Sequence, residues 1–251
     1  MSSGWKGYAT RDGNDLVSVL LDISMADTSV HPYFPTLVLA CVPLRAPGDD
    51  GLESDEEFDL FEGLFDALDD MALQAGAMLV ARRTWRGVRE HVFYVSSGVD
   101  LNEGIRRVMQ GYPDHACQIE TREDASWAFF LEAIFPSDIN LRIMTDDHLC
   151  ESLRDRGDDL VTPRRIDHSA FFGDEVSRQR FIRLIRASGY TIDGLLDPGG
   201  ALEEYGVTFS GVGCPSEISS IVAPLYGAAQ NLGGRYDGWE AEVVVRAGPR
   251  N

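Results

Sequence analysis

The sequence is short of positive charge. Its 251 residues include 22 Lys and Arg against 41 Asp and Glu, which gives a formal net charge of −19. A chain this acidic repels nucleic-acid phosphate and anionic lipid at long range. We therefore expect a protein partner, and neither direct nucleic-acid contact nor binding to a membrane surface.

Long apolar runs and paired cysteines are also missing. The apolar stretches are strand-sized, far below the roughly 20 residues that cross a bilayer. Residues 1–14 are polar and lack the apolar core of a secretion signal. The four cysteines, Cys41, Cys117, Cys150 and Cys214, lie far apart with no CxxC pair, as is typical of reduced thiols. These features predict a cytoplasmic protein.

Recognisable catalytic and metal-binding motifs are absent as well. The five histidines form no HExxH motif and no pair at metal-ligand spacing; they are His31, His91, His115, His148 and His168. No nucleophile, base and orienting group can be combined from the spacing. We expect no catalytic residue, no metal and no cofactor.

What the chain does have is an ordinary globular composition, with 44% hydrophobic and 25% charged residues. This length and composition can bury a sizeable core without disulfides. In the first half, Ser54 and Glu57 have capping-box spacing at the start of an apolar helical stripe. A second capping pair, Asp100 and Glu103, predicts a short helix. Strands are predicted over residues 5–10, 16–23, 36–44, 77–85, 88–96, 116–121 and 127–134.

The second half shows a similar order of elements. Thr145 is predicted to cap a short leading helix that ends at Gly157. Strands are predicted over residues 159–167, 190–196, 205–212 and 235–246, and helices over 176–188 and 218–229. Pro163 would then lie in an edge strand, where a missing N–H is tolerated.

Both halves therefore read β-α-β-β-α-β, the split βαβ or ferredoxin-like arrangement. We predict an α+β protein of two tandem ferredoxin-like domains, residues 1–138 and 139–251, whose antiparallel sheets carry helices on one face. The other face of each sheet would be free to meet a partner. The boundary is expected between about Phe135 and Asp146, where Pro136-Ser137-Asp138 breaks the pattern. The sequence does not indicate an oligomeric state.

Several short motifs in the second half resemble the RraB family, the regulators of ribonuclease E activity B. The resemblance covers roughly residues 145–245 and depends on Gly157-Asp158-Asp159-Leu160, Pro163-Arg164, Ile166-Asp167-His168, Phe171-Phe172, Gly189-Tyr190 and, most specifically, Tyr236-Asp237-Gly238-Trp239-Glu240. It implies a small acidic ferredoxin-like protein that binds ribonuclease E and restrains RNA decay without acting on RNA itself.

The first half resembles a bacterial domain family of unknown function (family number 695). The residues that carry this resemblance are Trp5, Tyr8, Tyr33-Phe34-Pro35, Asp50-Gly51-Leu52, Glu56-Glu57, Ala81-Arg82-Arg83-Thr84, Gly87-Val88-Arg89-Glu90 and Phe93-Tyr94. The two domains are often fused. From the residue types alone, Trp85, Arg82, Arg89 and Tyr94 on neighbouring strands read as a cation–π ladder across a hairpin.

The best candidates for partner binding are Arg235, Tyr236, Asp237 and Trp239. Aromatic and arginine side chains dominate the energetics of protein interfaces. Trp239 could equally fill the core between sheet and helices, with Asp237 capping a turn. A non-enzymatic acidic regulator, an inhibitor of ribonuclease E-type RNA decay through protein contact, is therefore the leading hypothesis.

Two alternatives stay open. One is a small enzyme or ligand sensor centred on Cys214, because Gly211-Val212-Gly213-Cys214-Pro215 precedes a predicted helix whose exposed N–H groups can lower a thiol pKa. The other is a structural two-domain adaptor. Residues 48–70 hold 11 acidic and no basic residues, and the predicted helix 176–188 is arginine-rich. Docking of the acidic segment on the arginine-rich helix would explain both charge clusters.

Overall fold

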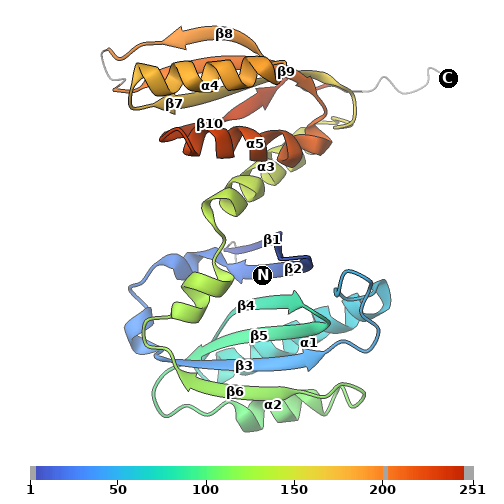
Figure 1. Ribbon diagram of the computed structural model, residues 1–251. Helices are drawn as coiled ribbons and strands as arrows, with labels where there is room; N and C mark the ends of the chain where they lie inside the picture. Colours follow the sequence, from blue (N-terminus) through green and yellow to red (C-terminus); the bar gives the residue numbers. More distant parts are fainter. Residues whose placement is uncertain (1–3, 200–202, 246–251) are drawn as a thin grey trace, which may run out of the picture. The chain divides into compact units, whose positions relative to one another are not determined.

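The computed structural model describes residues 4–199 and 203–245. The chain divides into two compact units, Met1–Asn140 and Leu141–Asn251. Each unit is an α+β domain built on one antiparallel sheet (Figure 1). The predicted domains also include residues 1–3, 200–202 and 246–251, which lie outside the described part of the chain.

The first unit has a six-stranded sheet in the order β1-β2-β4-β5-β3-β6 (Figure 1). Its elements are β1 (Trp5–Asp12), β2 (Asp15–Asp22), η1 (Ile23–Ala26), η2 (His31–Tyr33), β3 (Thr36–Pro43), α1 (Asp55–Gln74), β4 (Met78–Trp85), β5 (Val88–Val95), α2 (Asn102–Met109), β6 (Gln118–Glu123) and η3 (Phe130–Ile134). The strands predicted over residues 5–10 and 16–23 correspond to β1 and β2. They pair as a hairpin that extends the sheet beyond β4, outside the β-α-β-β-α-β order.

Both faces of this sheet are covered, so the prediction of helices on one face and a free second face is wrong for the first unit. On one face, Val38, Phe93 and Val95 pack beneath α1 and α2. On the other face, Tyr94 and Trp127 belong to a second core together with the turn at η3. The strands alternate apolar residues to both sides, and an apolar second face must be buried as well.

The segment 127–134 is helical rather than a strand. Trp127 has a positive φ of 56°, and η3 is a π-helix. The Asp124 carboxylate accepts hydrogen bonds from the main-chain N–H groups of Ala128 (2.8 Å) and Phe129 (3.0 Å), which starts a helical turn. The Trp127 indole donates to the Phe34 carbonyl oxygen at 2.9 Å.

The predicted capping box of α1 is also wrong. The Ser54 side chain makes no capping hydrogen bond. The Glu57 carboxylate accepts instead from the N–H groups of Arg45 (3.0 Å) and Ala46 (3.1 Å) and contacts His115. Burial alone would raise the pKa of Glu57, but these partners hold it below its usual value. Glu57 therefore ties the preceding loop to the helix.

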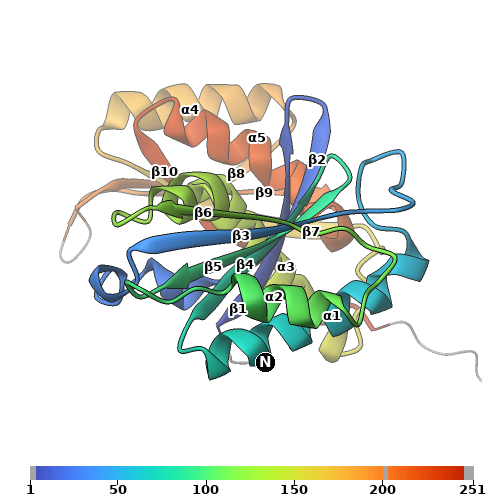
Figure 2. The same cartoon turned by 90° about the horizontal axis from the view of Figure 1, so that it is seen from below.

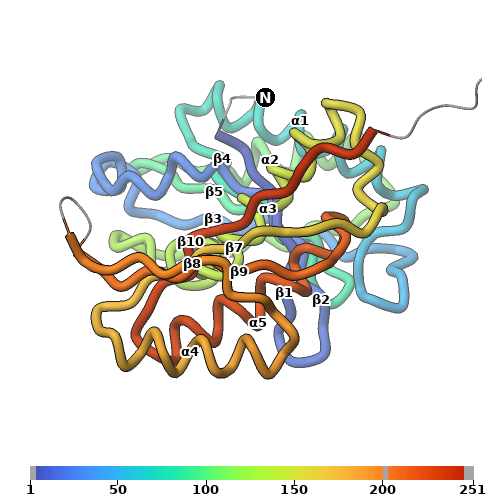
Figure 3. The backbone as a smooth tube through the Cα atoms, turned by 90° about the horizontal axis from the view of Figure 1, so that it is seen from above, coloured from blue at the N-terminus to red at the C-terminus, as the bar shows by residue number. Residues whose placement is uncertain are grey.

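The second unit has a four-stranded sheet in the order β10-β7-β9-β8. Its elements are α3 (Asp138–Asp155), β7 (Arg164–Phe172), α4 (Glu175–Ala187), β8 (Thr191–Leu196), β9 (Tyr205–Gly213), η4 (Pro215–Glu217), α5 (Ile218–Gln230) and β10 (Gly234–Ala241). α4 and α5 lie side by side and pack on one face of the sheet (Figures 2 and 3).

The start of this unit differs from the sequence-based expectation. α3 begins seven residues before Thr145, and the Thr145 hydroxyl donates back to the Leu141 carbonyl oxygen at 2.9 Å rather than capping a helix. Strand β7 begins after Pro163 and is central, paired with both β10 and β9. The predicted edge strand 159–167 is therefore shifted, because a central strand cannot accommodate a proline without losing a ladder hydrogen bond.

Candidate partner-binding site

The motif Tyr236-Asp237-Gly238-Trp239 forms the middle of the edge strand β10. In the antiparallel pairing with β7, Tyr236 lies opposite Ala170 and Trp239 lies opposite His168, with a bulge between Tyr236 and Gly238. A bulge adds one residue and changes which side chains share a face. Both aromatic side chains consequently point to the helix-covered side of the sheet, where Tyr236 is 5% and Trp239 is 7% exposed.

Glycine is required at the bulge. Gly238 has φ 150°, and a Cβ added there would lie 3.1 Å from Nη2 of Arg142. The Arg142 guanidinium fills that space: it donates to the Asp237 carbonyl oxygen at 3.0 Å and lies 5.3 Å from the centre of the Tyr236 ring. Helix α3 is thereby held against β10.

Trp239 is fixed by a buried carboxylate on the same helix. Its indole Nε1 donates to Oδ1 of Asp146 at 2.8 Å, and Nη2 of Arg142 contacts the same oxygen at 2.8 Å. Burial raises the pKa of the Asp146 carboxyl in spite of the opposing effect of Arg142 and Trp239. A buried charge of this kind persists only with such partners.

Tyr236 is fixed on the other side by His168. The Tyr236 hydroxyl lies 2.7 Å from Nδ1 of His168, whose ring stacks on Phe209 at a centroid distance of 5.2 Å. Burial lowers the pKa of His168 to about 4, although the neighbouring Asp167 acts in the opposite direction. The imidazole is therefore neutral near pH 7, and the two aromatic residues of the motif belong to the core.

The other two predicted residues lie on the surface. Arg235 donates to the Glu204 carboxylate from Nε at 3.0 Å, is ion-paired with Asp237, and lies 4.4 Å above the Phe171 ring. This face of the sheet is not covered by α4 or α5 and carries a hollow of about 610 Å³. The charged residues that line the hollow are Arg165, Asp167, Asp193, Asp237 and Glu240.

The hollow is acidic, with four carboxylates and one guanidinium among those charged residues. Arg165 is engaged by Asp167 at 2.7 Å and by Asp193 at 3.0 Å. Asp237 is paired with Arg235, and Glu240 makes no ion pair with any described residue. This charge distribution can attract a basic group.

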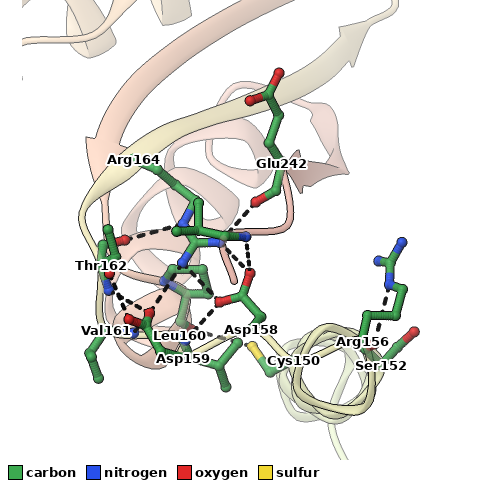
Figure 4. Close-up of polar contacts among 12 residues, drawn as sticks. Cys150, Ser152, Arg156, Asp158, Asp159, Leu160, Val161, Thr162, Arg164 and Glu242 are labelled. Carbon is green, nitrogen blue, oxygen red and sulfur yellow. Dashed lines mark hydrogen bonds and ion pairs between the residues drawn. The ribbon is translucent and has the colours of Figure 1, made fainter. Parts of the chain in front are cut away.

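Other motif residues of the second unit form a structural clamp (Figure 4). The Asp158 carboxylate accepts from Nη2 of Arg164 (2.8 Å) and from the N–H groups of Leu160 (2.7 Å) and Val244 (2.7 Å). The hydrogen bond from Arg164 is the largest cause that holds the pKa of Asp158 far below its usual value. The Arg164 guanidinium also donates to the carbonyl oxygen of Glu242 at 2.8 Å. The clamp joins the loop after α3 to the segment after β10.

Cys214 lies at the end of β9, before η4. Its thiol donates a hydrogen bond to the Val161 carbonyl oxygen at 3.2 Å. The helix that follows begins with a three-residue 3₁₀ turn, and α5 itself starts only at Ile218. Among residues 4–199 and 203–245, no group of three or more His, Cys, Asp or Glu side chains is placed to hold a metal ion.

In the first unit, the predicted cation–π ladder is arranged differently. Arg83 and Arg86 lie over Trp85, whereas Arg82 and Arg89 point to the aromatic rings of α1. The resulting buried cluster beneath α1 was not predicted. The sequence signal for this cluster is the alternation of charged residues along β4 and β5. It places charged side chains on the helix-covered face, where they need partners.

One arginine of the basic helix 176–188, which was predicted to dock on the acidic segment 48–70, is not available at the surface. Arg178 of α4 is buried and donates to the carbonyl oxygens of Leu196 (3.1 Å) and Gly206 (3.3 Å). Arg180, Arg183 and Arg186 remain exposed. No described helix is both long and apolar enough to span a membrane.

These features define a protein of two α+β domains, the second of which presents an acidic sheet face above a packed aromatic motif. The chain belongs to a family of unknown function, DUF695, whose model matches residues 3–135. That domain is followed by a domain of the RraB family, regulator of ribonuclease activity B, over residues 143–241. Both resemblances noted in the sequence are confirmed.

A search of curated proteins finds no match to this chain. Among solved structures, one assigned as a glycine cleavage system transcriptional repressor aligns with 9% identity and a TM-score of 0.25, over 82% of this chain and 98% of that one. An unknown protein from Galdieria sulphuraria aligns with 12% identity and a TM-score of 0.22, over 82% and 97% of the two chains.

Proposed function

We propose that the second domain regulates a ribonuclease by binding a protein and that it catalyses no reaction itself. The observation that carries this proposal is the match of residues 143–241 to the RraB family. The motif residues of that family support it, because here they serve packing and main-chain hydrogen bonding rather than chemistry. Ribonuclease E is the partner that we propose, in the cytoplasm.

The acidic hollow is the contact surface that fits this role best. Its four carboxylates and one guanidinium favour a basic segment of the partner. Arg235 and Asp237 would contact the partner directly from β10. Tyr236 and Trp239 would act from beneath, by fixing the course of the strand that presents those two residues.

The topology supports a common architecture for the two units. In the first unit, β3-α1-β4-β5-α2-β6 gives the sheet order β4-β5-β3-β6, and in the second, β7-α4-β8-β9-α5-β10 gives β8-β9-β7-β10. These orders are equivalent. We interpret both units as ferredoxin-like, with a hairpin added to the first.

The two alternatives have less support. An enzyme or sensor centred on Cys214 needs an activated thiol, and this thiol donates to a carbonyl group. A purely structural adaptor needs no acidic hollow. Neither alternative accounts for the family match, so the regulator is the function that we propose.

The proposal is tested with purified ribonuclease E, immobilised for surface plasmon resonance. Asp193→Lys combined with Glu240→Lys reverses two charges of the hollow. We expect the association rate constant to fall by about tenfold at low salt, because charge steering governs encounter. RNA cleavage in the presence of this variant should rise toward the uninhibited rate.

The matched control is Glu151→Lys combined with Asp155→Lys, which makes the same charge change at exposed positions of α3 outside the hollow. If the two double variants lose association rate equally, the hollow is not the contact surface. If the parent protein fails to bind the ribonuclease at all, this partner is excluded.

A further inference from the structure

Part of the first unit's helix-side sheet surface extends beyond the cover of α1, toward the β1–β2 hairpin at the sheet edge (Figure 1). Side chains directly opposite one another in antiparallel strands project to the same face. One row there is Ala9, Ser18, Thr84 and Arg89, because Ala9 pairs with Ser18, Ser18 with Thr84, and Thr84 with Arg89. The row runs from an open edge to the core.

The neighbouring row has the same direction. Gly7 pairs with Leu20, Leu20 with Arg82, and Arg82 with His91. A cavity of about 330 Å³ lies over the outer part of both rows. At the sheet edge its floor is formed by the small residues Gly7, Ala9 and Ser18. Toward the core it is bounded by an inner wall that includes the guanidinium groups of Arg82 and Arg89.

The inner wall has hydrogen-bonding capacity that no described residue uses. Arg89 is 1% exposed; its Nε donates to the Thr84 hydroxyl at 2.6 Å and its Nη2 is ion-paired with Oε1 of Glu53. Nη1 of Arg89 and Oε2 of Glu53 are buried without a hydrogen-bond partner among the described residues. The free donor and the free acceptor belong to two side chains that line the same cavity and are joined by an ion pair.

The other charges of the cluster are balanced. Arg82 is ion-paired with Glu62 of α1 and lies 5.1 Å from the centre of the Phe65 ring. Two guanidinium groups therefore face two carboxylates, and the cavity carries no net charge to hold a free anion. Burial lowers the pKa of Arg89, which the ion pair with Glu53 partly offsets.

The rim adds an aromatic surface. Phe58, at the start of α1, lines the cavity and is 46% exposed. An exposed aromatic ring in a cavity that Arg89 and Glu53 also line suits a planar group. Unsatisfied buried polar atoms are costly, and a ligand that satisfies both at once would recover that cost.

We propose that this cavity binds a small neutral molecule through an amide or lactam edge, whose C=O accepts from Nη1 of Arg89 and whose N–H donates to Oε2 of Glu53. The plane of the ligand stacks beside Phe58, over the small residues of the hairpin. A carboxamide and a heterocyclic lactam share this chemistry.

The test is a titration of the ¹⁵N-labelled full chain with uracil, a lactam, and separately with benzamide, a carboxamide, followed by NMR. We expect saturable shifts of the Arg89 Nε–H signal with at least one of them. 1,3-Dimethyluracil keeps the carbonyl groups but has no N–H donor, so it should bind about tenfold more weakly than uracil if uracil is bound. If only benzamide is bound, N,N-dimethylbenzamide serves as the corresponding control.

Two variants locate the site. Ala9→Leu fills the cavity from an exposed edge position and should abolish binding, whereas Thr10→Leu on the opposite face of the same strand should leave it unchanged. Glu53→Gln removes the carboxylate acceptor and should weaken binding about tenfold. ¹H–¹⁵N spectra confirm that each variant is folded.

The proposal is overturned if neither compound gives saturable shifts, if the N-methylated controls bind equally well, or if Thr10→Leu abolishes binding as Ala9→Leu does. Saturable binding of inorganic phosphate at the same residues, without binding of either amide, would replace it with an anion site.

Discussion

At the residue scale, the motif near the end of the second domain shows how one set of residue types serves two roles. Tyr and Trp are the side chains that anchor interfaces and also those that fill cores. The sequence pattern predicts that Tyr236 and Trp239 lie on a strand, but it does not predict which face of the sheet they occupy. That depends on the bulge at Asp237-Gly238, which turns Tyr236 and Trp239 to the same side.

The neutral His168 makes a pH-dependent contribution to stability. Its pKa is about 4 in the folded protein, against an ordinary value of 6.5, because burial disfavours the charged ring. Between these two values the unfolded chain binds a proton that the folded chain does not. Stability therefore falls as the pH decreases through this window, by about 2 kcal/mol between pH 7.5 and pH 5.

The measurement is the free energy of unfolding of the second domain, obtained from its urea transition at pH 7.5, 6.5 and 5. The groups that face His168 are Asp167, Arg142 and Tyr236. His168→Gln should lose this pH dependence, whereas His148→Gln, at an exposed position of α3, should keep it. An unchanged slope in His168→Gln would assign the pH dependence to another group.

At the element scale, strands and helices with a clear apolar period were predictable, and the segments between them were not. The apolar stripe of α5 and the alternation of β9 were enough to locate both. α3 was predicted too short because its early residues pack little, and Thr145 resembles a capping residue while bonding back to Leu141. The strand predicted from residue 159 is wrong at its start, because Asp158 to Thr162 form a polar turn. Side-chain hydrogen bonds stabilise this turn, and apolar periodicity does not reveal them.

The attachment of α3 to β10 depends on Trp239. Trp239→Phe keeps an aromatic ring but leaves the buried Asp146 carboxylate without the indole donor. We expect a loss of about 1–3 kcal/mol in the free energy of unfolding, measured by circular dichroism in urea. Trp239→Ala, which also leaves a cavity, should cost about 3–5 kcal/mol.

Arg235→Ala is the control on the same strand, because its ion pairs are exposed and should contribute less than about 1 kcal/mol. If Trp239→Phe is as stable as the parent, Arg142 alone satisfies Asp146. If the folded Trp239→Phe variant binds the ribonuclease with an unchanged dissociation rate, Trp239 has no part in presenting Arg235 and Asp237.

At the scale of the whole molecule, the negative charge is unevenly distributed. Residues 1–140 hold 24 acidic and 10 basic residues, and residues 141–251 hold 17 and 12. The first domain thus carries most of the charge that would steer a basic partner, while the family match that suggests the partner lies in the second. Steering falls off with salt, since the Debye length shrinks from about 10 Å at 0.1 M to about 3 Å at 1 M.

The division into two domains can be tested by limited proteolysis. The sequence predicts a boundary between about Phe135 and Asp146, and α3 contacts β10 through Arg142 and Asp146. A helix held in this way resists cleavage, because a protease needs an extended, locally open segment. We therefore expect the first cut between Phe135 and Asp138, in the segment that precedes α3, and two fragments that persist. Mass spectrometry of the fragments and their separate cooperative unfolding measure this outcome; early cuts within α3, or loss of both fragments together, would contradict two independently folded domains.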